Sequence, residues 1–269
     1  MSSSIQVAAV QFPVAIGDIE TNLLQAERAL RQLREKGVRL AVLPEMWSSG
    51  YDYPRLEQLA EQTPQVTGVL ERLTAELDMV VVGSLPEKDR DRLFNTAFVH
   101  DRGREAGRYR KLHLFSPMQE DRYLSAGDRT LVTDTSAGRL GLAICYDLRF
   151  PELFRKLALE GAELICLPAQ WPSPRQELWQ TLLRARAIEN QCFLIAANNC
   201  GTLGKLRFFG MSQILSPRGE ILAEGGTRAE APNALADRAD MAAYRQEIPA
   251  WQDRRPEIYG RLDGFRQGS

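Results

Sequence analysis

The stretch Gly141-Leu-Ala-Ile-Cys145-Tyr-Asp-Leu-Arg149-Phe-Pro151-Glu152 combines an apolar strand, a cysteine, a short charged turn and the start of a helix. Proline in the first turn and Gly161 just past the last residue predict a helix over 151–160. A turn from strand to helix places the Cys145 thiol outside the sheet, near free backbone N–H groups and the positive end of a helix dipole. These neighbours are expected to lower the thiol pKa and to make Cys145 a nucleophile. The alternative, from this segment alone, is a buried and inert cysteine.

Strand-like apolar runs alternate with helical patterns along most of the chain, which predicts an α/β fold with helices covering the faces of a sheet. The clearest helix is expected from about 19 to 36, capped by Asp18 and ended by Gly37. The predicted strands are Ile5–Phe12, Leu40–Leu43, Met79–Gly83, Asn95–Val99, Gly141–Cys145, Leu164–Leu167, Phe193–Ala197 and Ser212–Leu215.

A third helix is expected from Arg175 to about Asn190, with an apolar stripe as its inner face. That stripe consists of Leu178, Leu182, Ala185 and Ile188. Residues 37–44 and 161–168 also share the order glycine, short strand, proline, which indicates either two similar halves or simply two helix–strand units of the same kind.

No low-complexity linker divides the chain, so residues 1–269 are predicted to form one domain. The tail from about Tyr244 is polar and has no clear helical or strand period. Two aromatic residues, Trp251 and Tyr259, are expected to anchor it on the body or on a neighbouring subunit.

The composition excludes several classes of protein. A net charge of -1 offers no general attraction for nucleic acid or for an acidic membrane surface. The N-terminal residues are not expected to form a secretory signal, and no run is long and apolar enough to predict a transmembrane helix. The four cysteines lie far apart without a CxxC pair, which argues against zinc and fits a reducing cytoplasm. Because GxSxG, GxGxxG, P-loop and HExxH motifs are absent as well, no cofactor and no metal is expected.

A thiol nucleophile needs a base, and the residues offer two kinds. Only two histidines are present, and His113 lies in a basic, aromatic segment, so a Cys–His pair remains one alternative. Glu45 is the other candidate, because a charge directly after a buried strand needs a partner or a use. If residues 109–113 are extended, Lys111 and His113 lie on the same side, and Lys111 supplies a cation for a thiolate or an oxyanion. From its local sequence, Glu120 resembles an ordinary loop residue.

Three motifs, Leu43-Pro-Glu45, Arg110-Lys111-Leu-His113 and Ile144-Cys145-Tyr-Asp-Leu-Arg-Phe-Pro-Glu152, together resemble the nitrilase superfamily of carbon–nitrogen hydrolases, and within it the Nit and ω-amidase branch. The resemblance implies Glu45 as general base, Lys111 as the cation beside the oxyanion and Cys145 as nucleophile. The family's second glutamate falls on Glu120, although Ala126 replaces a frequent proline. The resemblance also implies a four-layer αββα sandwich that pairs sheet to sheet with a second subunit, and hence a homo-oligomer, at least a dimer.

These residues predict an amidase that releases ammonia through a cysteine thioester, with a small amide and water as its substrates. The backbone N–H of Tyr146 is expected to hold the oxyanion together with Lys111. Arg149 is predicted to bind a substrate carboxylate, or else to form an ion pair with Asp147 or Glu152. Trp171 is expected to wall the pocket.

The expected substrates are ω-amides of 2-oxo dicarboxylic acids, 2-oxoglutaramate or 2-oxosuccinamate. Deaminated-glutathione-type amides and N-carbamoyl amino acids are the alternatives on the same triad. A non-enzymatic alternative is a catalytically silent protein that binds a small acid or a partner.

Overall fold

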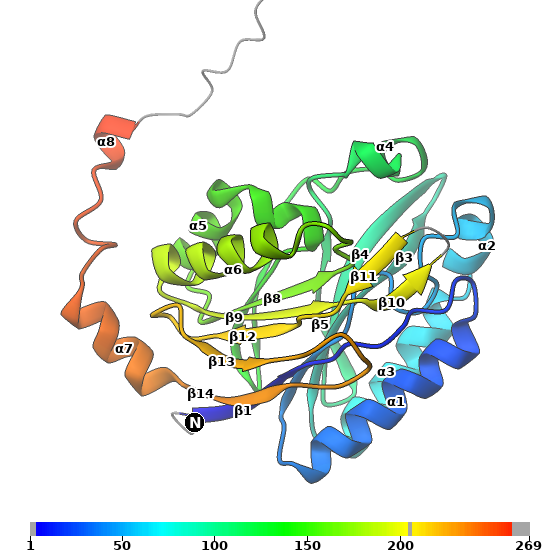
Figure 1. The fold of residues 1–269 in the computed structure, drawn as a ribbon, viewed down its shortest axis with the longest axis horizontal. Helices are drawn as coiled ribbons and strands as arrows, with labels where there is room; N and C mark the ends of the chain where they lie inside the picture. The colour runs from blue at the N-terminus through cyan, green and yellow to red at the C-terminus, as the bar shows by residue number, and fades with distance from the viewer. Residues whose placement is uncertain (1–3, 204–205, 260–269) are drawn as a thin grey trace, which may run out of the picture.

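The computed structural model describes residues 4–203 and 206–259, and its centre is formed by two six-stranded mixed sheets (Figure 1). The first sheet has the order β14 (Asn233–Asp237), β1 (Ser4–Ala9), β2 (Leu40–Val42), β3 (Val80–Asp89), β4 (Arg92–Asp101), β5 (Arg104–Arg110). The second has the order β13 (Ile221–Glu224), β12 (Gln213–Leu215), β9 (Phe193–Asn198), β8 (Leu164–Ala169), β7 (Gly138–Leu142), β6 (Val132–Thr135). A separate hairpin joins β10 (Cys200–Leu203) to β11 (Leu206–Phe209).

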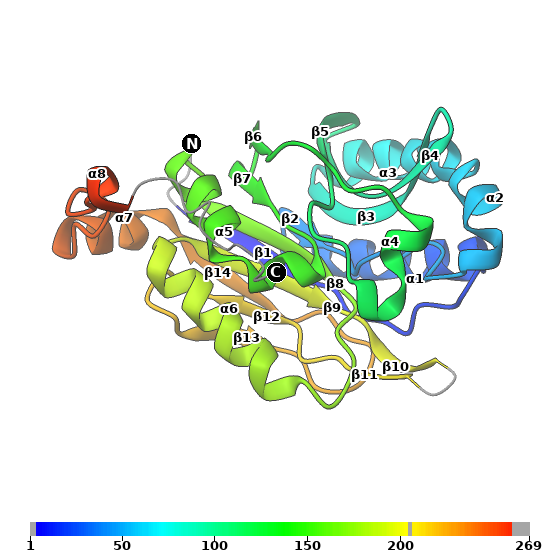
Figure 2. The ribbon, with the colours of Figure 1, turned by 90° about the horizontal axis from the view of Figure 1, so that it is seen from above.

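Alternation along the strands produces four layers. In the first sheet Val7 and Val42 face the second sheet, while Ala8 and Ala41 face helices α1 (Ile19–Glu35) and α3 (Thr63–Leu77). Helices α5 (Pro151–Leu159) and α6 (Gln176–Asn190) cover the second sheet (Figure 2). The predicted α/β four-layer sandwich is therefore confirmed. Helices cover both outer sheet faces of the sandwich, and the expected pairing with a second subunit stays a prediction.

The two halves of the chain repeat one topology. From β14 through β5 the strand pairs run antiparallel, parallel, parallel, antiparallel, antiparallel, and from β6 through β13 they run in the same sequence. Strands β2 and β8, which begin within the matching segments 37–44 and 161–168, hold equivalent central positions. The short sequence echo thus marks two similar halves.

The clearest predicted helix forms as expected. Asp18 caps α1 by accepting a hydrogen bond from the Thr21 N–H at 3.0 Å, and Gly37 follows the helix with a φ of +78°. Strand β1 ends at Ala9, earlier than predicted, because Gln11 leaves the ladder for an isolated bridge to Glu230.

The predicted inner face of α6 is wrong. Leu178 and Ile188 are 47% and 42% exposed, whereas Trp179, Leu183 and Ala187 are buried. The inner face also holds Arg186, whose guanidinium donates to the Leu148 carbonyl at 3.0 Å and lies over Phe154. Hydrophobic periodicity predicts the wrong buried face of α6, because an arginine lies on the inner face and an apolar stripe lies on the outer face.

The C-terminal segment is more regular than predicted at its start. Residues 238–247 form α7 (Arg238–Glu247), and the Ile248 carbonyl then accepts a hydrogen bond from Gln191 Nε2 at 2.9 Å. Beyond it, α8 (Pro256–Tyr259) lies away from the sheets (Figure 1), and 260–269 of the predicted tail lie outside the described residues. Within the described ranges, no helix is both long and apolar enough to cross a membrane.

The shorter elements lie mostly near the strand ends that form the site. They are α2 (Leu56–Ala60), α4 (Glu120–Tyr123) and the 3₁₀ turns η1 (Tyr53–Arg55), η2 (Ser116–Met118) and η3 (Cys145–Arg149).

Candidate active site

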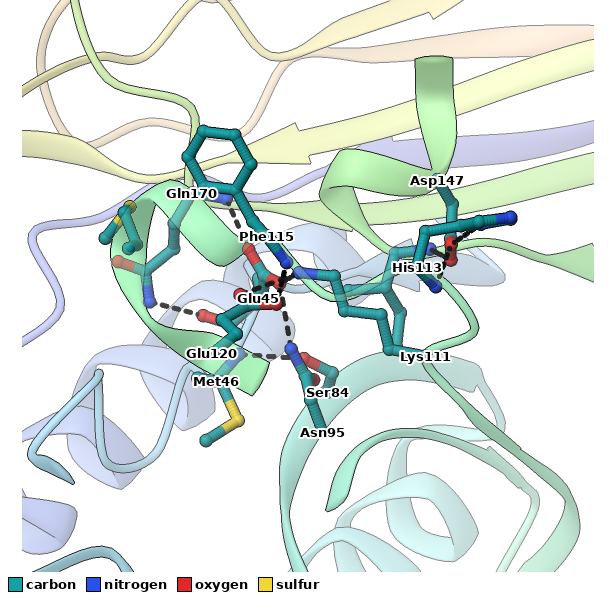
Figure 3. Close-up of polar contacts among 12 residues, drawn as sticks. Glu45, Met46, Ser84, Asn95, Lys111, His113, Phe115, Glu120, Asp147 and Gln170 are labelled. Carbon is teal, nitrogen blue, oxygen red and sulfur yellow. Dashed lines mark hydrogen bonds and ion pairs between the residues drawn. The ribbon is translucent and has the colours of Figure 1, made fainter. Parts of the chain in front are cut away.

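Four of the predicted residues meet near strand ends of the two sheets, and Figure 3 labels three of them, Glu45, Lys111 and Glu120. Glu45 follows β2, Lys111 follows β5, Cys145 follows β7 and Glu120 begins α4. Parallel strands collect their carboxyl ends at one edge, which is the usual place for an α/β active site. The face-to-face packing of two such sheets brings both sets of strand ends together.

Lys111 joins the two glutamates. Its Nζ lies 2.8 Å from Glu45 Oε1 and 2.8 Å from Glu120 Oε1, and all three side chains are buried. Burial opposes the charge of Lys111, but the carboxylates of Glu120 and Glu45 raise its pKa well above the usual value. Burial likewise opposes the charge of Glu120, but Lys111 leaves the pKa of Glu120 lowered. At neutral pH this pair is therefore an ammonium beside a carboxylate.

Glu45 is fixed by further donors from both sheets. Asn95 Nδ2 on β4 donates to Oε1 at 2.8 Å, and the Gln170 N–H just after β8 donates to Oε2 at 3.0 Å. Gln170 Nε2 also donates to the Glu45 carbonyl at 2.7 Å, and Asn199 holds the Gln170 amide in turn. The carboxylate is thereby held in one orientation.

Glu120 accepts two hydrogen bonds besides that of Lys111. The Tyr51 hydroxyl donates to Oε1 at 2.6 Å, and the Phe115 N–H donates to Oε2 at 2.9 Å. Asn95 Nδ2 reaches the same hydroxyl at 3.2 Å, which links the partners of both glutamates. Burial and the Glu120 charge raise the pKa of Tyr51, so its hydroxyl stays a proton donor.

The expectation of a low thiol pKa is wrong. Cys145 begins η3 with a φ of +46° and is 6% exposed. Burial and, next, the Glu45 charge raise the pKa of the Cys145 thiol well above its usual value, outweighing Lys111 and the N–H of Gln170. The resting group is therefore a neutral thiol, which needs a base to become a nucleophile.

Asp147 holds the turn that carries the cysteine. It is fully buried and accepts the Tyr109 hydroxyl at 2.7 Å and the Ile144 N–H at 2.8 Å. His113 bonds the same carboxylate through its N–H at 3.1 Å and its Nδ1 at 2.7 Å, and its ring stacks on Phe150. His113 thus supports the turn, and within the described part of the chain its hydrogen bonds go to Asp147 and its ring packs on Phe150.

A narrow pocket opens above Cys145, with a free volume of about 10 Å³, enough for about one water. Arg149 and Trp171 line it as expected, with the guanidinium 5.3 Å from the Trp171 ring. Arg149 forms no ion pair with Asp147 or Glu152, although the structure describes all three, so its structural alternative is wrong. Rim side chains have to move when an amide enters.

Several residues of the site were not predicted. Tyr51, Met118, Gln170 and Arg175 line the pocket or hold the glutamates. Conversely, the Tyr146 ring packs on Phe115, at 4.8 Å, and on Phe150, and it is not part of the pocket lining. Only its backbone N–H remains available, because it donates to no acceptor in the described part of the chain. In that part no three His, Cys, Asp or Glu side chains group as metal ligands do.

Comparison with known proteins decides the family. The profile of the carbon-nitrogen hydrolase family matches residues 6–246. This chain belongs to the carbon–nitrogen hydrolase family. The predicted superfamily and the predicted class of enzyme, a hydrolase of amide bonds, are thereby confirmed.

Curated relatives of this carbon–nitrogen hydrolase cover nearly its whole length. It is 36% identical to the 2-oxoglutaramate amidase of Bacillus subtilis over 94% of this chain and 98% of that protein. It is 31% identical to the human omega-amidase NIT2 over 96% and 97% of the two chains. Among solved structures, the carbon-nitrogen hydrolase of Helicobacter pylori superposes with a TM-score of 0.92 at 28% identity, covering 98% and 99%.

Proposed function

We propose that this carbon–nitrogen hydrolase is an ω-amidase that releases ammonia from 2-oxoglutaramate or a closely similar 2-oxo acid amide. The buried contact of Lys111 with Glu45, beside the Cys145 thiol and under a rim that contains Arg149, carries the proposal. The sequence similarity to a 2-oxoglutaramate amidase supports the substrate class.

The raised thiol pKa makes Glu45 the general base in this proposal. Glu45 takes the thiol proton as the sulfur of Cys145 attacks the amide carbon, and it then gives that proton to the leaving nitrogen, which departs as ammonia. Water attacks the thioester after giving a proton to Glu45. The acid is released, and the returning proton restores the thiol.

Two donors are suited to the tetrahedral oxyanion. The Lys111 ammonium is held in place by both glutamates, and the Tyr146 N–H has no acceptor in the described protein. Preorganised donors in a water-poor pocket stabilise developing charge without reorganisation. Glu120 acts through Lys111, because its carboxylate holds the same ammonium that contacts Glu45.

Arg149 and Trp171 bind the far end of the substrate in this proposal. A guanidinium stacked near an indole and free of carboxylate partners is suited to a substrate carboxylate. Arg149→Gln is therefore expected to raise KM for 2-oxoglutaramate by about tenfold or more.

We further propose that the chain is one domain and that it forms a homodimer through α6. One continuous core includes strands of both sheets. The exposed Leu178 and Ile188 on α6 lie beside β13, whose Ile221 and Leu222 are 43% and 38% exposed, and the α6 residue Gln180 bonds Glu224 of β13. Such an apolar patch fits a second copy of the same surface. The four free cysteines suit a reducing cytoplasm.

The testing experiment measures ammonia release from 2-oxoglutaramate, 2-oxosuccinamate, a deaminated-glutathione amide and N-carbamoyl amino acids, with Cys145→Ala as the control. We expect activity concentrated on the two 2-oxo acid amides and lost in the folded variant. Preference for the third or fourth substrate would replace the substrate assignment. A folded protein that binds these acids but turns over none of them would be the silent relative.

A further inference from the structure

Arg175 enters the pocket from an element that the sequence analysis did not connect with the site. It is the residue before α6, is half-buried, and lines the same cavity as Glu45 and Cys145. Its guanidinium lies 5.8 Å from the centroid of the Phe115 ring. Among the described residues it forms no ion pair and donates no side-chain hydrogen bond to the protein. Removing a cation partly from water without an anionic partner costs free energy and is uncommon in folded proteins.

The formal charges of the pocket residues indicate which substrate charge Arg175 favours. Glu45 and Glu120 against Lys111 leave one negative charge, and Arg149 cancels it. Arg175 then leaves the pocket with one positive charge more than its carboxylates balance. A substrate with a single carboxylate restores neutrality, whereas a neutral amide leaves the excess charge in place.

The two arginines approach from different elements. Arg149 comes from η3 and lies over Trp171, while Arg175 precedes α6 and lies over Phe115. A guanidinium that rests on an aromatic face still has N–H groups with which to bind an anion. Both side chains line the same pocket and can therefore contribute donors to one substrate carboxylate.

We propose that Arg175 is a second carboxylate-binding residue, which makes the site select monoanionic ω-amides over neutral amides of equal length. This inference rests on the proposed ω-amidase function, and it assigns to Arg175 a part of substrate selection that Arg149 alone does not supply.

The kinetic test compares 2-oxoglutaramate with pentanamide, a neutral amide of the same chain length. For Arg175→Gln we expect kcat/KM for the anionic substrate to fall about 10- to 100-fold, mainly through KM, and that for pentanamide to change by less than about threefold. Arg175→Lys retains charge but not the planar fork, so an intermediate loss is expected. Arg72→Gln on the exposed side of α3 removes the same charge far from the pocket and is the matched control.

Equal losses for both substrates would mean a structural role for Arg175, and no loss for either substrate would mean that its charge faces solvent. Either result overturns the inference.

A second test does not depend on turnover. Iodoacetate and iodoacetamide alkylate the same Cys145 thiolate but differ by one negative charge, so the ratio of their rates cancels any change in thiol pKa. We expect Arg175→Gln to lower the iodoacetate-to-iodoacetamide ratio at the Cys145 peptide about tenfold, and Arg72→Gln to leave it unchanged. A lowered ratio with no turnover of 2-oxoglutaramate would refute the ω-amidase and keep Arg175 as an anion site. An unchanged ratio would refute the role of Arg175 whatever the substrate is.

Discussion

The Gln170 N–H donates to Glu45 Oε2 at 3.0 Å, across 125 positions of sequence and between the two sheets. Glu45 follows β2 and Gln170 follows β8, the equivalent central strands of the two halves. The Gln170 N–H also lowers the pKa of the Cys145 thiol, although burial and the Glu45 charge outweigh it. The repeated topology thus places the end of one half against the end of the other, with Glu45 held at that junction.

Glu45→Gln separates two effects of one carboxylate. Loss of the base is expected to lower kcat about 100- to 10,000-fold. The thiol pKa is expected to fall, because the Glu45 charge is the largest contribution after burial that raises it. Ammonia release measures the first effect, and the pH dependence of iodoacetamide alkylation measures the second. A thiol pKa that stays high would show that burial alone sets it.

Lys111→Met leaves two buried carboxylates without their cation. We expect the free energy of unfolding to fall by about 3–5 kcal/mol at neutral pH, because uncompensated buried charge is costly. Urea denaturation measures this change. Adding Glu120→Gln to Lys111→Met removes one of the two charges and should restore part of the stability without restoring activity. A double variant no more stable than the single one would contradict the charge argument.

The fold was largely predictable because it depends on local patterns. The helix after Asp18 follows from capping, and the apolar run before Cys145 marks β7, which begins and ends three residues earlier than the predicted Gly141–Cys145. Strand β5 was not predicted because its sequence is polar, which an edge strand permits. The face of α6 was misjudged since an outward apolar stripe and an inward Arg186 reverse the usual pattern.

The site was only partly predictable because its geometry is made by distant contacts. Glu45, Lys111 and Cys145 each end or follow a strand, which is visible in sequence. Asn95 looks like an ordinary strand residue, and its contact with Glu45 depends on how β4 lies beside the end of β2. The prediction of a low thiol pKa was wrong for a similar reason. A helix-start motif can be recognised from local sequence, whereas the burial of the thiol next to Glu45 depends on distant residues.

Asp147→Asn tests the support of the nucleophile turn. Asp147 is expected to act as a positioning residue, since its carboxylate bonds Tyr109, His113 and the Ile144 N–H. Loss of charge-assisted bonds should lower the free energy of unfolding by about 2–3 kcal/mol, and Tyr109→Phe by about 1 kcal/mol. We expect kcat to fall in Asp147→Asn with KM little changed, because the thiol and not the substrate rim is displaced. A KM effect alone would place the disturbance at the rim instead.

His100 is the second histidine, and it lies sealed in β4 away from the site. It is fully buried, and neither ring nitrogen has a hydrogen-bond partner among the described residues. Burial lowers the pKa of His100 to about 4, and the nearby charges of Glu105 and Arg108 act in opposite directions. The folded protein therefore holds the neutral ring, whereas the unfolded chain protonates it below about pH 6.5.

This difference should appear in the pH dependence of stability. The stability that neutral His100 contributes is fully present above pH 6.5 and is lost as the pH falls toward 4, by about 3 kcal/mol in total. His100→Leu removes the titrating ring and both unpaired nitrogens, so its unfolding free energy should decline less over this range. Urea denaturation of both proteins at pH 7.5, 6, 5 and 4 measures the difference. Parallel declines would mean that carboxylates elsewhere, and not His100, govern the loss of stability in acid.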